Sequence, residues 1–496
     1  MKKLKLTVIG ENCIDTTFPT QGRLSRGFVS RIRKEIKNAD IVITSHPLVF
    51  PVAIKAVHSK KHLLVYYARN MESLLMTKLL DDGASKTEKL LHKAVRAEYE
   101  LCHAADLILV CSQEDRDNFA RFFFVPPDKI TIMPNGVFSE KVSEKLDALL
   151  TQEYNRKMHA KSQILMVSSY PPDRCGIGAY AYQQTRFLRQ EGHHVDVLAL
   201  RGNGKYQSAL DNPKKLKLLD KLAAQYDKVI MQYHPDFFKM NLSDPKKANA
   251  KQLDIADLWK RHKNIEVLCH EIDYTLTVNR ESREAHILRE KWSGADSLIF
   301  HTQLEMEQFC EKLNIPFDES KMRVIAHNSY FTKFRDISQR EARKELGIPQ
   351  DKEVYLCIGF IHPAKAFDRA AEVFARFQNH EKEGKALYIV GSVRSVCDEI
   401  INYLKKLKQY SRNCENIHLH EKYVSDEAFD TWISACDYVI IPYREIWSSG
   451  VLERAGLFDK KCIVRDVGGM KEQLKEGDIL FEDYSELEGI IRGEAV

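Results

Sequence analysis

Two carboxylates bracket a segment with the composition of a phosphate site. Glu445 and Glu453 flank Ser448-Ser449-Gly450, and an apolar run at residues 438–443 precedes them. The apolar run predicts a buried parallel strand, and Val451 onward predicts a helix. The free N–H groups and the positive dipole end of a helix start suit a phosphate. The sequence therefore indicates an anion site held between two carboxylates.

Helix capping is the structural interpretation of the second glutamate. A capping box places a Glu three residues after the capping Ser. Glu453 follows Ser449 by four residues and Ser448 by five, so capping explains it poorly. Spacing alone leaves both interpretations open.

The elements that must hold such a site alternate along the chain. In the first 150 residues, apolar runs alternate with helical patterns, which predicts parallel βαβ units. The expected strands are 6–9, 40–44, 63–67, 106–111 and 130–133, and the clearest helices are 27–37, 86–102 and 113–123. Ser112 is expected to cap the last of these helices. Residues 140–160 predict a charged connecting helix and a linker.

An internal repeat links this first segment to a later one. Ala105-Asp106 recurs as Ala295-Asp296, an offset of 190 (295 − 105). The same offset maps Ser112 onto Thr302 and Phe119 onto Phe309, and Lys129 maps onto Lys321 at an offset of 192. The first 150 residues are therefore expected to be a partial copy of the domain that follows.

The segment from residue 161 to 335 carries polar groups where strands end. Gly176 and Gly178 separate a first strand from a first helix, so that backbone N–H groups face outward. His270 ends a later strand, at the edge where α/β proteins bind ligands, and His234 ends another. For each histidine, a purely structural role is the alternative to contact with a ligand. Tyr180, Gln183 and Phe187 are expected to pack the first helix against the rest of the domain. Two lysine-rich stretches, 205–217 and 244–251, predict surface loops.

Several motifs resemble those of one enzyme family. These are the Glu-x7-Glu pair, the Gly359-Phe360-Ile-His-Pro-Ala-Lys365 turn, the Pro-Pro–Gly-x-Gly opening at 171–178, and Gly468-Gly469. Their order resembles retaining glycosyltransferases of the GT-B fold, glycosyltransferase family 4 in particular. The early Pro134-Asn135-Gly136-Val137 and Arg69-Asn70-Met71-Glu72 also resemble pieces of that family's first domain.

The resemblance implies a fold and a division of the chain. The fold is α/β, with two Rossmann-like GT-B domains facing a cleft and an additional partial Rossmann-like domain before them. Residues 1–150 are then the partial domain with its linker, 161–335 the acceptor domain, and 336–496 the nucleotide-sugar donor domain with a short terminal helix. The first segment is expected to serve packing, dimerisation or partner binding, with a contribution to an acceptor site as the alternative.

The resemblance also implies roles for the site residues. Glu445 would contact the transferred sugar and stabilise its positive charge, Glu453 would bind the ribose, and His270 would contact the sugar from the facing domain. The predicted donor-binding residues are Lys365, His362, Ser449, Gly450, Val451, Gly176 and Gly178. Lys365 would neutralise the diphosphate as the leaving group gains charge.

Two departures from the family pattern affect the donor loop. His362 stands where many members have Arg, and Ala366 replaces a Gly. These departures and the extra half-domain motivate an alternative, a non-catalytic glycosyltransferase-like binding or regulatory subunit. A sugar-nucleotide epimerase or a phosphorylase of the same fold is a further alternative.

Composition narrows the function classes. The 496 residues have a net charge of +5, which is insufficient to predict nucleic-acid binding but is compatible with a phosphorylated substrate or an anionic membrane surface. Eleven cysteines without a Cys-x-x-Cys pair favour a reducing cytoplasm over a zinc or disulfide scaffold. No transmembrane helix or signal peptide is expected. The one Asp-x-Asp, at 115–117, falls inside a predicted helix, which agrees with a metal-independent, cofactor-free transfer.

The resemblance completes the list of partners. A nucleotide-sugar donor and a glycan or lipid-linked acceptor are expected, in the synthesis of cell-surface polysaccharide or glycoconjugate. Contact with the inner face of the cell membrane is compatible with the charge. Residues 1–150 are a candidate surface for a homo-oligomer or a partner enzyme.

Overall fold

The computed structural model describes residues 4–9, 26–58, 60–80, 85–123, 125–126, 129–133, 140–202, 204–207, 213–238, 245–270, 281–377, 384–393 and 397–493. By contacts between residues, the chain divides into two compact units, residues 1–173 with 188–231 and residues 174–187 with 232–496. None of the helices in the described ranges has both the length and the apolar character needed to span a bilayer. The Pro134-Asn135-Gly136-Val137 motif lies outside these ranges.

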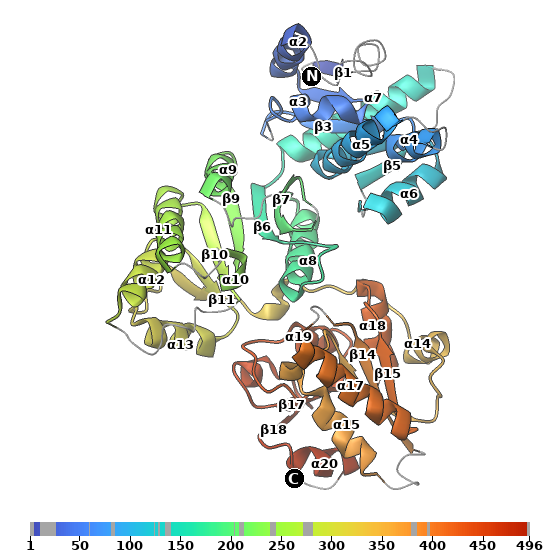
Figure 1. Cartoon of the computed structure of the whole chain (residues 1–496), viewed down its shortest axis with the longest axis vertical. Coiled ribbons are helices and arrows are strands. Elements are labelled where there is room, and N and C mark those ends of the chain that lie inside the picture. The colour runs from blue at the N-terminus through green and yellow to red at the C-terminus, as the bar shows by residue number, and fades with distance from the viewer. Residues whose placement is uncertain are drawn as a thin grey trace. The chain divides into compact units, whose positions relative to one another are not determined.

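Three sheets alternate with helices along the chain (Figure 1), which confirms the predicted α/β class with Rossmann-like units. The first sheet is parallel and its strands follow one another in chain order. Its strands are β1 (Leu6–Ile9), β2 (Ile41–Thr44), β3 (Leu63–Ala68), β4 (Leu107–Val110) and β5 (Ile130–Ile132). Its helices are α2 (Arg26–Asn38), η2 (Pro47–Val49), α3 (Phe50–Ala53), α4 (Glu72–Leu80), α5 (Ser85–Ala104), α6 (Gln113–Phe123) and α7 (Glu140–Met158).

Both faces of the central strands β2, β3 and β4 are buried, which explains their continuous apolar sequences, whereas Leu6 and Val8 of β1 are exposed. Along β3, Leu64 and Tyr66 pack into one core cluster, and Leu63 and Val65 pack into another on the opposite face. Leu150 of α7 belongs to the second cluster. The segment predicted as a charged connecting helix is therefore also a covering layer of this sheet.

The second sheet has seven strands in the order β12-β11-β10-β9-β6-β7-β8. They are β6 (Gln163–Ser169), β7 (His194–Arg201), β8 (Tyr206–Gln207), β9 (Lys228–Tyr233), β10 (Ile265–Cys269), β11 (Leu298–Phe300) and β12 (Met322–Val324). The helices are α8 (Gly176–Gln190), α9 (Pro213–Ala223), α10 (Pro235–Phe238), α11 (Pro245–Arg261), α12 (Arg283–Ser293), α13 (Gln303–Leu313) and η5 (His327–Tyr330).

Two predictions about this region are wrong. The lysine-rich stretches 205–217 and 244–251 were expected to be loops, but β8 and α9 begin in the first, and α11 begins in the second. Each helix starts at a proline, Pro213 or Pro245, whose fixed φ and missing N–H suit a first helical position. A high lysine content indicates an exposed segment, but it does not exclude a helix.

The internal repeat agrees with the structure. At an offset of 190, the bounds of α6 map onto those of α13, and at 192 the bounds of β5 map onto those of β12. Both helices have a hydroxyl cap: Ser112 Oγ accepts a hydrogen bond from Asp115 N at 3.0 Å, and Thr302 Oγ1 accepts one from Glu305 N at 3.2 Å. The predicted cap at Ser112 is confirmed.

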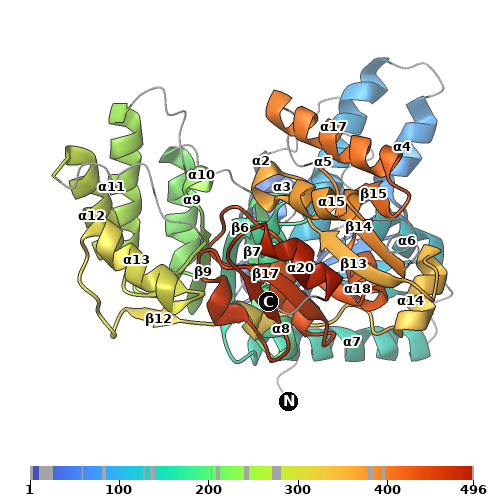
Figure 2. The same ribbon diagram turned by 90° about the horizontal axis from the view of Figure 1, so that it is seen from below.

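The third sheet is parallel and has six strands in the order β15-β14-β13-β16-β17-β18. They are β13 (Glu353–Ile358), β14 (Lys385–Gly391), β15 (Ile417–Glu421), β16 (Tyr438–Ile441), β17 (Lys461–Arg465) and β18 (Ile479–Phe481). The helices are α14 (Gln339–Leu346), η6 (Pro363–Lys365), α15 (Phe367–Ala375), α17 (Asp398–Asn413), α18 (Asp426–Ala435), α19 (Gly450–Gly456), η7 (Met470–Gln473) and α20 (Glu486–Arg492). Figure 2 shows α15 and α17 beside each other near β14 and β15.

Candidate active site

Strand order locates a binding edge in the third sheet. The order reverses between β13 and β16, and open α/β sheets bind ligands outside the carboxyl ends of the strands at such a switch point. The loop after β13 leads to Lys365, and the loop after β16 leads to Ser449. The topology therefore places the predicted lysine and the predicted anion site on the two loops that flank the switch.

Lys365 is a partly buried cation without a carboxylate partner among the described residues. Its Nζ lies 3.7 Å from the centre of the Tyr443 ring, so the aromatic face is its nearest recorded contact. Burial lowers the pKa of Lys365 to about 7. A bound anion would restore the charged form, and this lysine is therefore suited to hold a diphosphate.

Neighbouring positions of the Lys365 loop make local contacts. His362 is exposed, and its Nδ1 accepts a hydrogen bond from Ala364 N at 3.2 Å, which caps η6. Ala366 has φ +51°, in the left-handed region that favours glycine, and this agrees with the Gly that the resemblance leads one to expect at this position. Arg444 supplies a nearby guanidinium, but Asp368 pairs with it at 2.9 Å.

Gln473 organises the start of α19. Its Oε1 accepts a hydrogen bond from Ser449 N at 2.7 Å, and its Nε2 donates to Glu453 Oε1 at 2.7 Å. Ser449 Oγ caps the helix by accepting from Leu452 N at 3.3 Å. The Ser449 N–H is therefore occupied in this structure. The N–H groups of Gly450 and Val451 have no intrahelical acceptor, as at any helix start.

The two predicted carboxylates lie in different environments. Glu453 is only 3% exposed, burial raises its pKa, and its Oε2 has no hydrogen-bond partner within the described residues. Glu445 is exposed, and none of the described residues forms an ion pair or a hydrogen bond with its carboxylate. Both acceptor groups are therefore available to hydroxyls of a ligand, Glu453 inside the protein and Glu445 at the surface.

The second sheet places the predicted histidine and glycines at its own binding edge. His270 follows β10, and its Nε2 lies 2.5 Å from Gln232 Oε1. Gly176 begins α8 after β6, next to the strand-order reversal between β6 and β9. The prediction that the two glycines precede the helix is therefore wrong, because both lie in its first turn. A Cβ at Gly176 would meet no atom within 4 Å, so packing does not require this glycine, whereas Gly178 is buried.

Two histidines that the sequence interpretation missed join this group. His301 follows β11, His327 begins η5, and their rings stack with centroids 4.2 Å apart. His327 Nδ1 lies 3.1 Å from Ser448 Oγ, in the loop before α19. The signal used for His270, a polar residue directly after a buried parallel strand, also applies to His301. It would have found this residue.

The first sheet offers no equivalent site in its described residues. Its strands run in chain order without a switch point. The start of α4, which carries the Arg69–Glu72 motif, is occupied by the buried Glu98 carboxylate, which accepts from Glu72 N at 2.9 Å and Ser73 N at 2.8 Å. A protein carboxylate therefore already takes the position of an anionic ligand.

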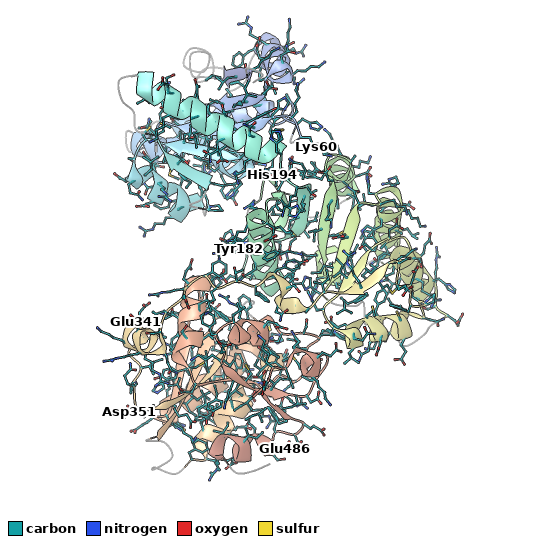
Figure 3. The ribbon with its side chains drawn as sticks, turned by 180° about the vertical axis from the view of Figure 1, so that it is seen from behind. Lys60, Tyr182, His194, Glu341, Asp351 and Glu486 are labelled. Atoms are coloured by element: carbon teal, nitrogen blue, oxygen red, sulfur yellow. The ribbon has the colours of Figure 1, made fainter. Side chains whose placement is uncertain are left out.

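A cluster in the unit formed by residues 1–173 and 188–231 has metal-like composition. Ligand atoms of Asp106, His194 and Asp196 lie within 4.8 Å of one another, and Figure 3 labels His194 at the start of β7. However, Lys157 Nζ lies 2.7 Å from Asp106 and Lys205 Nζ lies 2.8 Å from Asp196. These buried ammonium groups balance the carboxylates, so the cluster is an ion-pair network that does not need a cation.

Two family models match the chain. The model of Glycosyltransferase Family 4 matches residues 8–141, and the model of Glycosyl transferases group 1 matches residues 338–492. The first match covers the first sheet, and the second match covers the third sheet. The second sheet lies between the two matched segments in the sequence. No curated protein matches the chain in sequence.

Three solved structures are among those similar to this chain. HepE of Anabaena in complex with UDP-glucose is 14% identical, with 67% of this chain and 89% of that chain covered and a TM-score of 0.47. WaaG, a glycosyltransferase involved in lipopolysaccharide biosynthesis, is 14% identical, with 67% and 90% covered and a TM-score of 0.47. Sucrose-phosphate synthase of Thermosynechococcus elongatus is 15% identical, with 67% and 89% covered and a TM-score of 0.48.

Proposed function

Because this chain belongs to the family 4 glycosyltransferases of the GT-B fold, we propose that it transfers a sugar from a nucleoside diphosphate sugar with retention of configuration. The acceptor is a glycan or a lipid-linked sugar, in the synthesis of cell-surface polysaccharide or glycoconjugate. The reaction takes place in the cytoplasm, at the inner face of the membrane where the acceptor is lipid-linked.

Lys365 is the observation that carries the proposal. A partly buried ammonium group without a carboxylate partner in the described chain costs folding free energy unless a ligand supplies the anion. It lies on the loop after β13, across the strand-order reversal from the loop that leads to α19. A diphosphate held there receives the charge that it needs as the glycosidic bond breaks.

The remaining groups have complementary tasks. Glu453 Oε2, a buried acceptor that meets the geometric criteria for a hydrogen bond with none of the described residues, suits the ribose hydroxyls. Glu445 contacts the transferred sugar and stabilises the positive charge that develops at its anomeric carbon. Gly450 and Val451 donate N–H groups to the phosphates, and Ser449 joins them only when Gln473 releases its N–H. His270 and the first turn of α8, with Gly176 and Gly178, contact the sugar and the acceptor.

The proposed reaction needs no metal and no cofactor. Lys365 supplies the positive charge that a divalent cation supplies in metal-dependent transfer. The first 150 residues serve as an interaction or packing module instead of a second active centre, and nucleic acid is not a substrate. The Glu98 carboxylate at the start of α4 supports this assignment.

A binding subunit without turnover is the second candidate. It is favoured by the hydrogen bond from Ser449 N to Gln473, which blocks one expected phosphate donor, and by His362 in place of Arg. Such a subunit would bind nucleotide sugar but release no nucleotide.

A screen for nucleotide-sugar hydrolysis and transfer tests both candidates. Purified wild type is incubated with UDP-, GDP- and ADP-sugars, with Glu453→Ala beside it and EDTA in parallel reactions. Release of nucleotide by wild type, unaffected by EDTA and lost in the variant, supports the transferase. Binding without release supports the binding subunit. Absence of both with every donor refutes the proposed function.

A further inference from the structure

Four aromatic side chains form a cluster at the carboxyl edge of the second sheet. The Tyr180 ring lies edge-to-face against the imidazoles of His270, His301 and His327, with centroid distances of 5.4, 5.1 and 4.9 Å. We call these four residues the tyrosine–histidine cluster. Tyr180 comes from α8, and the histidines follow or begin three other elements, so the cluster exists only in the folded chain.

Hydrogen bonding fixes the chemistry of His301. Its Nδ1 lies 3.2 Å from the carbonyl oxygen of Ile325, and a carbonyl only accepts, so Nδ1 carries the proton. Burial lowers the pKa of His301 to about 4, and the ring is therefore neutral at physiological pH. Nε2 is then a hydrogen-bond acceptor.

Two polar atoms of the cluster are buried without a hydrogen-bond partner among the described residues. These are His301 Nε2 and the Tyr180 hydroxyl, on side chains that are 3% and 2% exposed. A buried polar group without a hydrogen bond destabilises the fold, and native proteins rarely contain one without a reason. His301 Nε2 accepts a hydrogen bond and the Tyr180 hydroxyl donates one. Hydroxyl groups of a ligand both donate and accept, so they suit these two atoms.

Packing does not explain these residues. The internal repeat aligns His301 with Cys111, because both precede the hydroxyl cap of an equivalent helix. The strand–cap–helix unit therefore forms without an imidazole at this position. A phenylalanine at position 180 would offer the same ring to the three histidines and would bury no hydroxyl.

The cluster is connected to the donor loop. His327 Nδ1 lies 3.1 Å from Ser448 Oγ, and His327 Nε2 would lie 3.7 Å from a Cβ on Gly450. Burial and then the charges of Tyr330 and Glu453 raise the pKa of the Tyr180 hydroxyl, which places it within electrostatic reach of the Glu453 carboxylate. The residues that carry the unpartnered atoms thus contact His327, which in turn contacts the loop before α19.

We propose that the Tyr180 hydroxyl and His301 Nε2 bind hydroxyl groups of the sugar carried by the nucleotide donor. The tyrosine donates a hydrogen bond and the neutral imidazole accepts one, so the cluster recognises an uncharged, hydroxyl-bearing sugar ring. This inference rests on the proposed function, because it requires a nucleotide-sugar donor.

The test separates the sugar from the nucleotide. Calorimetry gives the dissociation constant of a nucleotide sugar that wild type turns over and that of the matching free nucleotide, and their ratio measures the sugar's contribution. Tyr180→Phe removes only the hydroxyl. His301→Asn keeps a donor near the position of Nδ1 for Ile325 and removes the Nε2 acceptor. We expect each variant to lose about 5- to 10-fold of affinity for the nucleotide sugar and none for the free nucleotide.

Tyr226→Phe is the matched control. The Tyr226 hydroxyl is buried in the other unit and donates to Asp196 at 2.6 Å. This substitution is expected to lower the melting temperature and leave the affinity ratio unchanged, whereas Tyr180→Phe keeps the melting temperature of the ligand-free protein.

Two results are distinguishable. If wild type binds no nucleotide sugar, the proposed function fails and this inference fails with it. If wild type binds one and both variants bind it with the wild-type affinity ratio, only this inference is overturned, and a buried water or an acceptor hydroxyl satisfies the two atoms.

Discussion

Replacing Lys365 by methionine is predicted to abolish a pH dependence of nucleotide-sugar binding. The wild-type ammonium lies against the Tyr443 ring, without a carboxylate partner in the described residues, and burial lowers its pKa to about 7. A bound diphosphate would favour the charged form and return the pKa toward its ordinary value of 10.5. Binding therefore takes up a proton above pH 7, and affinity falls as pH rises.

The size of this effect follows from linkage. If only the protonated lysine binds, affinity changes with the protonated fraction, which falls about 50-fold between pH 7 and pH 9. The methionine variant has no such slope. It should bind about 90-fold more weakly than wild type at pH 6, where the wild-type lysine is almost fully protonated, and the two affinities should converge near pH 9.

Lys365→Met should stabilise the fold at low pH, although it weakens nucleotide-sugar binding there. The folded pKa of Lys365 lies below the unfolded value, so the penalty is fully present below pH 7 and disappears as pH rises to 10.5. A difference of about 3.5 pH units at about 1.4 kcal/mol each bounds the penalty at about 5 kcal/mol. Partial exposure of the side chain reduces this to about 2 kcal/mol. Lys365→Met should therefore be more stable than wild type at pH 6.

Calorimetric titration between pH 6 and pH 9 at constant ionic strength measures the affinities. The ligand must be a nucleotide sugar, because the terminal phosphate of a free nucleotide itself ionises near pH 6. Lys461→Met, at an exposed lysine of the same sheet, is the control and should keep the wild-type slope. A wild-type affinity that is independent of pH, or a Lys365→Met slope equal to that of wild type, would refute the role of Lys365.

Three further perturbations test other parts of the account. Glu453→Gln should reduce transfer at least 100-fold and stabilise the protein at pH 8; because burial raises the pKa of Glu453, this gain should vanish near pH 4 in thermal melts. Gly468→Ala should lower the free energy of unfolding by more than about 2 kcal/mol and reduce activity, because φ is +58° and the new Cβ would lie 1.9 Å from a backbone oxygen. Gly347→Ala is the control: φ is +70° but no atom lies within 4 Å of the new Cβ, so the substitution should lower the free energy of unfolding by about 1 kcal/mol and leave activity unchanged. Lys157→Met should destabilise by about 3 kcal/mol in denaturant unfolding, because the buried Asp106 loses its 2.7 Å partner, and an unchanged midpoint would contradict the ion-pair network.

Local sequence patterns predicted the elements that position the site. The apolar run before Glu445 is β16, and the helix start after Ser449 is α19, because a buried strand and a capped helix are encoded by neighbouring residues. The strand-end rule found His270 and would also have found His301. Lysine-rich composition misled at Pro213 and Pro245, where proline starts a helix.

Tertiary contacts could not be predicted in the same way. Gln473 contacts Ser449 and Glu453 from 24 and 20 residues away along the chain, so no local pattern signals its role. The lack of a carboxylate beside Lys365 depends on how separate loops pack. The different burial of Glu445 and Glu453 likewise emerges only in the folded protein, although their spacing singled both out.

A crystal structure with a bound nucleotide sugar tests the central claim most directly. A diphosphate oxygen is expected about 3 Å from Lys365 Nζ, with ribose hydroxyls hydrogen-bonded to Glu453 Oε2. A nucleotide bound at the first sheet, or bound at the third sheet away from both side chains, would contradict it.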